Sequence, residues 1–156
     1  MSAYLPVSIA TLRANVRLGF DVFIHISAKH ILYIRGADSI EIERLSHLSA
    51  KHVRHLFIQE KDKEAYEKFL NASKKAALQD PTMPVTEKAE IVNGQAKAAV
   101  EKMFENPESK ENYGATEDAA RSQVELLRKC PAALEKMLAI AEQDNTTYQH
   151  SVNVSN

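Results

Sequence analysis

The residues of this sequence that are best suited to chemistry are six histidines and two closely spaced arginines, Arg13 and Arg17. Neutral imidazole is a common protein ligand of transition metals, and paired guanidinium groups suit phosphate oxygens. One histidine, His150, lies near the C-terminal end of the sequence. The other five are in the front half, as His25, His30, His47, His52 and His55. No cysteine or pair of carboxylates completes a coordination set near those five, so we expect no metal site there.

The two arginines belong to a short motif, Arg13-Ala-Asn-Val-Arg17. It is similar to the Arg-x-x-x-Arg element by which PilZ-type domains bind cyclic di-GMP, and the resemblance implies a cyclic-dinucleotide site at Arg13 and Arg17. Those domains also carry an Asp/Asn-x-Ser-x-x-Gly segment, and the nearest candidate, Asn71 to Ala76, lacks the glycine. Because short motifs also match by chance, this receptor function is kept as an alternative.

Other kinds of active site find no support in the residue pattern. The four glycines are isolated, so no glycine-rich loop is available to cradle a phosphate. The single cysteine, Cys130, has no base near it in the sequence, and one thiol excludes an internal disulfide. We therefore expect this chain to have no cofactor and no catalytic site of its own.

Charge and hydropathy limit the partners and the compartment. The formal net charge is −1, with basic residues in excess up to Gln79 and acidic residues in excess beyond it. Neither half has the concentrated basic face of a nucleic-acid binder. No stretch reaches the roughly 18 consecutive apolar residues of a membrane span, and the N-terminus lacks a signal-peptide pattern. The sequence predicts a cytoplasmic protein without a nucleic-acid or membrane partner.

The elements that must position these residues form a small α+β module in residues 1–80. Apolar residues alternate along Phe20–Ile26, which predicts a strand with Phe23 and His25 on its second face. A polar link, Ser27-Ala28-Lys29, follows this strand and leads into a second apolar run that Gly36 ends. The two runs are therefore predicted to form an antiparallel hairpin. The remaining elements expected here are a strand at Leu5–Val7, a turn through residues 9–13, the second hairpin strand at Ile31–Arg35, a helix burying Ile40, Ile42, Leu45 and Leu48, and a strand at Val53–Ile58.

Residues 81–156 are expected to be helical, after a linker at Thr82-Met83. Alanine-rich heptad spacing runs from Val85 to Met103 and predicts a weak helical seam that packs either within the chain or in a homodimer. Asn106-Pro107 ends this helix, and a loop through Tyr113-Gly114 follows. Two further helices are predicted, one capped by Thr116 and burying Ala120, Val124 and Leu127, and one after Pro131 carrying Leu134, Met137, Leu138 and Ala141.

The C-terminal residues resemble the start of the catalytic domain of HD-GYP-type phosphohydrolases. A helix rich in Leu and Met, Leu134–Ile140, leads through an acidic segment to Tyr148-Gln-His150-Ser-Val-Asn-Val154. The front half is similar to the N-terminal module of some bacterial members, at Val7-Ser8-Ile9, Thr11-Leu12-Arg13, Phe20-Asp21-Val22-Phe23-Ile24 and Glu43-Arg44-Leu45.

This resemblance implies the N-terminal regulatory region of a metal-dependent enzyme that opens cyclic di-GMP by attack of metal-activated water. By the resemblance, His150 is one metal ligand, of iron or manganese, that acts only with a downstream catalytic domain. Thr146 stands where some members have a further glutamate ligand, and the His-Asp pair and Gly-Tyr-Pro stretch are absent. We therefore expect this chain to be non-catalytic and to sense a signal or dock a signalling protein, relaying the effect to its own catalytic domain. A stand-alone interaction adaptor is the alternative.

Overall fold

The structure is a computed structural model, and it describes residues 3–142. The chain divides into two compact units, Met1–Ser73 and Lys74–Asn156. The division falls within helix α2 (Lys63–Gln79), whereas the sequence places it after residue 80, where this helix has ended. The α+β class is confirmed, with the strands in the first unit.

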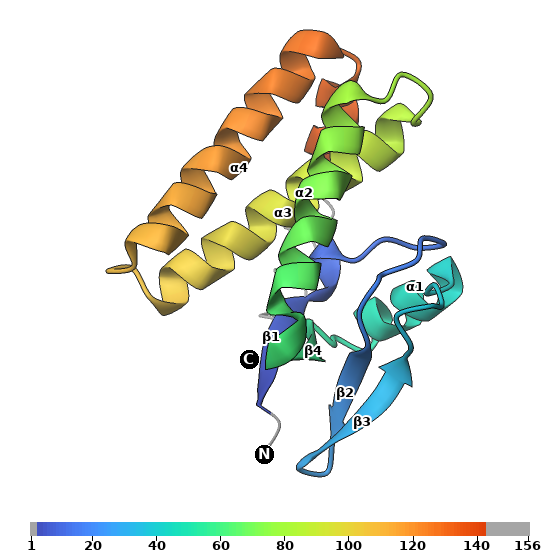
Figure 1. The fold of residues 1–156 in the computed structure, drawn as a ribbon. Helices are drawn as coiled ribbons and strands as arrows, with labels where there is room; N and C mark the ends of the chain where they lie inside the picture. The colour runs from blue at the N-terminus through green and yellow to red at the C-terminus, as the bar shows by residue number, and fades with distance from the viewer. Residues whose placement is uncertain (1–2, 143–156) are drawn as a thin grey trace, which may run out of the picture. The chain divides into compact units, whose positions relative to one another are not determined.

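The first unit contains a four-stranded antiparallel sheet in the order β1-β4-β2-β3. Strand β1 (Tyr4–Ser8) pairs with β4 (His55–Gln59) over its whole length. Strands β2 (Val22–Ile26) and β3 (Lys29–Ile34) form the predicted hairpin. Strand β4 meets β2 only at the pair Phe57–Phe23, so the outer part of the hairpin is a two-stranded ribbon (Figure 1).

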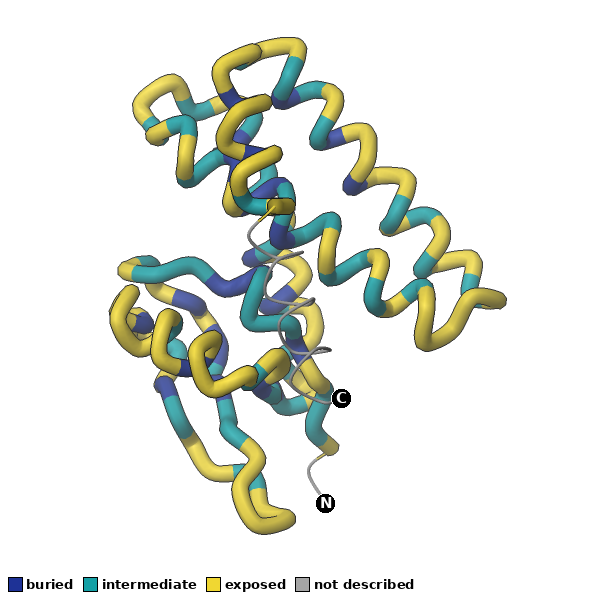
Figure 2. Tube along the Cα trace, turned by 180° about the vertical axis from the view of Figure 1, so that it is seen from behind, coloured by how far each residue is buried: buried dark blue, intermediate teal, exposed yellow. Residues whose placement is uncertain are grey.

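Two tight turns follow strands of the sheet, one directly after β1 and one between β2 and β3. Ser8 caps the short 3-10 helix η1 (Ile9–Thr11), where its hydroxyl accepts a hydrogen bond from the backbone N–H of Ala10. Ser27 and Ala28 link β2 to β3 with positive φ angles of 50° and 65°. That backbone suits a two-residue hairpin loop, although glycine or asparagine is the usual occupant. This strained turn is exposed (Figure 2).

One face of the sheet is the core of the first unit. Cross-strand partners share a face, so Leu5, Val7, Leu56 and Ile58 lie together. Helix α1 (Ile42–Ala50) contributes Leu48, and the first half of α2 contributes Tyr66 and Phe69. The ring of Phe20 meets the rings of Tyr66 and Phe69 edge to face, each at 5.6 Å between centroids.

The predicted apolar stripe of α1 is wrong in its first two members. Ile40 lies before the helix, which begins after Glu41, and its side chain is buried in the core cluster of the first unit, where its backbone forms a bridge with Ala14. Ile42 is 52% exposed, since it occupies the first turn and points away from the sheet. Leu45 and Leu48 pack on the core as predicted.

The second unit is helical. Helix α3 (Val85–Glu105) and helix α4 (Lys110–Lys129) form an antiparallel pair, and residues 133–142 are also helical (Figure 1). The front of the alanine-rich seam, at Ala89 and Val92, is buried in a core cluster with Leu126, Ala133 and Met137. This part of the seam therefore packs within the chain.

Helix α4 corrects two predictions. It begins at Lys110, with the Ser109 hydroxyl accepting from the N–H of Asn112, so Tyr113 and Gly114 are helical rather than in a loop. Thr116 is not the cap, because its hydroxyl donates to the carbonyl of Asn112 one turn back.

The buried face of α4 also differs from the predicted one. Ala119, Ser122 and Leu126 are buried, whereas Ala120 is exposed and Val124 is 55% exposed. Ser122 tolerates burial because its hydroxyl donates to the carbonyl of Asp118. Among residues 3–142, no helix has the length and apolar character needed to cross a membrane.

Candidate functional site

The second face of the sheet carries a cluster of rings, here named the ring cluster: Tyr4, Phe23, His25, His30 and Phe57. The Tyr4 ring stacks on His30 at 4.0 Å and meets Phe23 edge to face at 5.1 Å. His30 lies 4.8 Å from both His25 and Phe57. The predicted placement of Phe23 and His25 on this face is confirmed.

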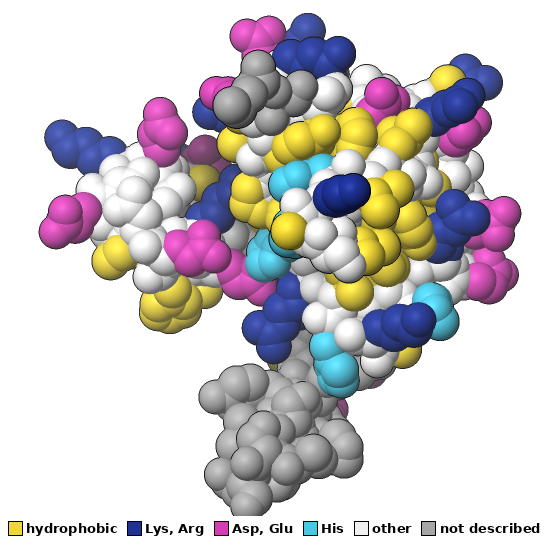
Figure 3. Space-filling view, turned by 90° about the horizontal axis from the view of Figure 1, so that it is seen from below, with side chains coloured by type: hydrophobic (Ala, Val, Ile, Leu, Met, Phe, Trp, Pro, Cys, Tyr) yellow, Lys and Arg dark blue, Asp and Glu magenta, His cyan; other side chains and the backbone are white. Residues whose placement is uncertain are grey.

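Strand register explains why these rings meet. His25 pairs with His30 and Phe23 pairs with Phe57, and cross-strand partners project from the same face. Leu32, which pairs with Phe23, continues this face and is 45% exposed. Seen from the hairpin end, histidine and hydrophobic side chains adjoin one another on the surface (Figure 3). Since aromatic pairs contribute about 0.5–1.5 kcal/mol beyond burial, the ring cluster supports the projecting hairpin.

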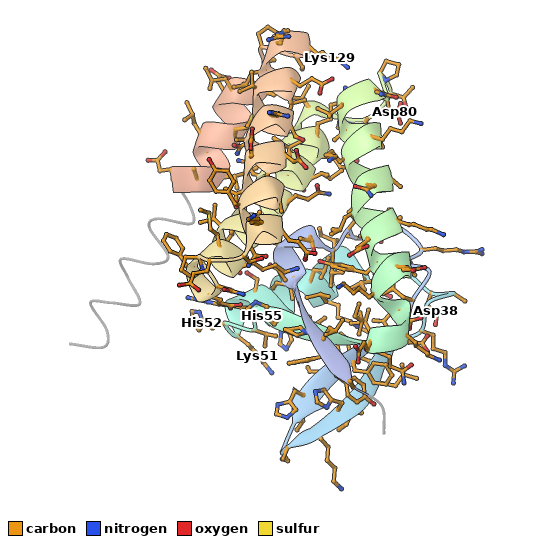
Figure 4. All side chains as sticks on the ribbon, turned by 60° about the vertical axis from the view of Figure 1, so that its left-hand side comes forward. Asp38, Lys51, His52, His55, Asp80 and Lys129 are labelled. Atoms are coloured by element: carbon orange, nitrogen blue, oxygen red, sulfur yellow. The ribbon has the colours of Figure 1, made fainter. Side chains whose placement is uncertain are left out.

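The remaining front-half histidines do not join this cluster. His47 is exposed on α1, and His52 follows that helix with a φ of 62°. His52 and His55 lie on the other side of the unit from Asp38 (Figure 4). Within the described part of the chain, no three His, Cys, Asp or Glu side chains are grouped as a metal site requires.

A groove of about 500 Å³ lies along β3 and is here named the β3 groove. It is lined by Leu32, Tyr33, Ile34, Arg35, Asp38, Ser39 and Arg44. Residues 32–34 of this lining belong to β3, which is an edge strand of the sheet, and Arg35 follows directly after the strand. The groove therefore runs along the backbone edge of β3. Its opposite wall comes from the connection to α1 and from the first turn of α1.

Two guanidinium groups, Arg35 and Arg44, give the β3 groove its chemistry. Neither forms an ion pair with any residue between 3 and 142. Arg44 lies over the ring of Tyr33, 5.4 Å from the centroid, which holds its guanidinium beside the strand. With Asp38 as the single carboxylate in the lining, positive charge is in excess, and guanidinium pairs suit carboxylate or phosphate.

Sequence reasoning missed this groove, although one signal was present. Arg35 ends the second hairpin strand and Arg44 follows within the next helix, so two cations flank a strand that could be an edge. Arg13 and Arg17, the two residues of the cyclic-dinucleotide motif, are not among the residues that line the groove. Arg17 is exposed and forms a backbone bridge with Ser39, while Arg13 is half-buried. His150 lies outside the described residues.

The groups whose pKa departs from the ordinary value lie outside the β3 groove. Burial raises the pKa of Tyr66, against the lowering effect of its hydrogen bond with Thr11. Hydrogen bonds from Thr82 lower the pKa of Asp80, at the turn between α2 and α3. Burial, and then the charge of Glu87, raises the pKa of Glu90. None of these shifts marks a catalytic acid or base beside a groove.

Comparison with known proteins gives one informative similarity. No family model matches the chain, and no curated protein does. Among solved structures, the chain is similar to Bd1817, a HDG"Y"P protein from Bdellovibrio bacteriovorus, with a TM-score of 0.76 and 31% sequence identity. The similarity covers 88% of this chain but 45% of Bd1817, so the chain spans less than half the length of that protein. The chain therefore has a fold related to part of an HD-GYP protein.

Proposed function

We propose that this chain is the regulatory N-terminal portion of an HD-GYP-like metal-dependent phosphohydrolase that acts on cyclic di-GMP, and that it is not catalytic by itself. The observation that carries the proposal is the similarity to Bd1817, which accounts for most of this chain and for less than half of that HD-GYP protein. The resemblance of Tyr148–Val154 to the start of the catalytic domain supports the same assignment.

The metal does not fit the described residues, which offer no group of ligands for it. The proposed iron or manganese would be held by the catalytic domain, with His150 as the one ligand from this chain. The chain's own role is to bind a signal or a partner through its α+β unit. The helices α3 and 133–142 then relay the state of that unit to the catalytic domain, since packed helices shift as rigid elements.

The proposal is tested on the gene that encodes this chain and on the full protein that the gene specifies, here named the parent protein. We expect the reading frame to continue beyond Asn156 into a His-Asp pair. The parent protein should hydrolyse cyclic di-GMP only when loaded with metal, and this chain alone should not hydrolyse it. Hydrolysis by this chain alone, or a parent frame without the His-Asp pair, would contradict the proposal.

A stand-alone interaction adaptor is the second candidate, and the exposed apolar side chains of the helical unit favour it. Val100 and Phe104 lie one turn apart on α3 and are 40% and 83% exposed, and Leu138 is 60% exposed. Such side chains mark a surface that a partner can cover. For the adaptor, we propose a second copy of this chain or a signalling protein as that partner. A gene whose reading frame stops at Asn156 would favour the adaptor over the regulatory portion, and a frame that continues into a His-Asp pair would contradict the adaptor. Analytical ultracentrifugation of the chain alone then shows whether the partner is a second copy.

A third proposal is cyclic-dinucleotide binding through Arg13 and Arg17. Calorimetric titration of cyclic di-GMP into the chain tests it directly. Heat that disappears in the variant Arg13→Ala/Arg17→Ala would support the site, provided that the variant unfolds at an unchanged temperature. A titration of the unaltered chain without heat removes the proposal.

A further inference from the structure

Strand β3 forms one edge of the sheet, and no strand within residues 3–142 pairs with its outer side. The strand order places β1 and β3 at the two edges of the sheet. An edge strand exposes unpaired N–H and C=O groups that can pair with another extended segment. Proteins protect such edges with proline, and β1 carries Pro6 at its middle. Strand β3, with the sequence Lys-His-Ile-Leu-Tyr-Ile, has no proline and carries charge only at Lys29.

The β3 groove lies along this unprotected edge. Residues 32–34 belong to the strand itself, and the opposite wall leaves room for a segment beside them. Ile31 and Leu32 are 46% and 45% exposed, so the edge offers apolar contacts as well as backbone groups. Their side chains point to opposite faces, which matches the alternating side chains of an added strand.

The charges in the groove select among possible occupants. Arg35 and Arg44 lie at the same end of the strand, and no described carboxylate pairs with either of them. A second copy of β3 would bring Lys29 and another pair of arginines toward this edge, and like charges side by side are unfavourable. A small anion would satisfy the arginines but not the backbone edge. An extended segment with an acidic side chain satisfies both.

We propose that the β3 groove binds an extended, acidic peptide segment of a partner protein. The segment adds to the sheet as a strand beside β3 and places a carboxylate against Arg35 and Arg44. Backbone hydrogen bonds to the edge supply affinity, and the two guanidinium groups supply specificity for the carboxylate. This inference goes beyond the proposed regulatory function and does not depend on it.

Selection from a displayed library of random nonapeptides on the full chain provides the probe. We expect the enriched peptides to combine β-branched or aromatic residues with at least one Asp or Glu. The best synthetic peptide is then titrated by fluorescence anisotropy. The variant Arg35→Glu/Arg44→Glu should weaken binding at least tenfold, whereas Arg54→Glu, an exposed arginine beside β4, should change it less than twofold.

Two controls separate strand addition from simple charge attraction. N-methylation of the peptide at alternate positions should abolish binding for the set that faces β3 and leave binding intact for the other set. The milder variant Arg35→Gln/Arg44→Gln replaces the glutamate variant if that one melts at a lower temperature. The proposal is overturned by a library without enrichment, by peptides without carboxylates, by binding that both arginine variants retain, or by equal effects of the two methylated sets.

Discussion

The hydrogen bond between Thr11 and Tyr66 ties helix α2 to the start of the sheet, and its removal should reveal a measurable coupling. The two hydroxyl oxygens are 2.6 Å apart in a buried setting, where Thr11 is 5% and Tyr66 is 7% exposed. Thr11 donates its only hydroxyl proton to the carbonyl of Ser8, at 2.7 Å. Tyr66 must therefore be the donor to Thr11.

Because Tyr66 donates and Thr11 accepts, the two single variants should differ in how much stability they lose. Tyr66→Phe removes a donor and should lower the free energy of unfolding by about 1 kcal/mol, the net contribution of an ordinary hydrogen bond. Thr11→Val leaves the buried Tyr66 hydroxyl without its acceptor and the Ser8 carbonyl without its donor, and should cost about 2–3 kcal/mol. The double variant should cost less than the sum, since replacing both partners removes the unsatisfied hydroxyl.

Urea unfolding followed by circular dichroism measures the four free energies of this double-mutant cycle. Tyr113→Phe is the matched control, because Tyr113 is 61% exposed on α4 and should change the free energy of unfolding by less than about 0.5 kcal/mol. A coupling energy below about 0.3 kcal/mol would refute the reasoning, as independent sites behave in that way. A Tyr66→Phe variant that is less stable than Thr11→Val would refute the assigned donor.

Three further predictions concern stability. Gly36→Ala should lower the free energy of unfolding by about 1–3 kcal/mol, because an added Cβ would lie 2.7 Å from the backbone nitrogen of Phe20. Gly114→Ala should raise it by about 0.5–1 kcal/mol, because Gly114 is helical and an added Cβ would meet nothing within 4 Å. Thermal melting of the two variants checks that the two effects have opposite signs. Ser73→Ala should stabilise by about 1 kcal/mol in urea unfolding, since the buried hydroxyl makes no hydrogen bond with the described residues. Because the pKa of Tyr66 is raised in the folded chain, its contribution to stability is complete below the ordinary pKa of 10.0 and is lost as the pH rises through the folded pKa. When urea unfolding is repeated above pH 10, the unaltered chain should therefore lose more stability than Tyr66→Phe. Equal losses in the two proteins would contradict this prediction.

Local residue patterns predicted the secondary structure where a single strong signal acted. The hairpin followed from alternation along Phe20–Ile26, and the end of α3 followed from Asn106-Pro107. Helix α4 was mispredicted at its start because Ser109 and Thr116 are both good caps by residue type. The choice depends on Thr116 bonding back to Asn112 within a helix that already extends past it, which no local pattern reveals.

Faces were predicted less well than elements, since packing decides them. The apolar stripe of α4 at Ala120 and Val124 is exposed because the helix turns Ala119 and Leu126 toward its neighbours. Ile26 shares the alternation of the buried Val22 but is 48% exposed, because β4 ends its pairing with β2 at Phe23 and leaves the hairpin uncovered beyond it. A periodic pattern shows which side chains share a face but not how far the covering layer extends.

The strand order is the step that sequence could not supply and that creates the β3 groove. Strand β4 is the last of the four strands in chain order, yet it lies between β1 and β2 in the sheet and does not pair with β3. Had β4 paired with β3, the backbone groups that now line the groove would be satisfied within the sheet. Because it pairs with β1, the proline-bearing strand takes one edge and the unprotected strand takes the other, next to Arg35 and Arg44. The binding capacity proposed for this chain is therefore a consequence of one long-range pairing and not of any motif.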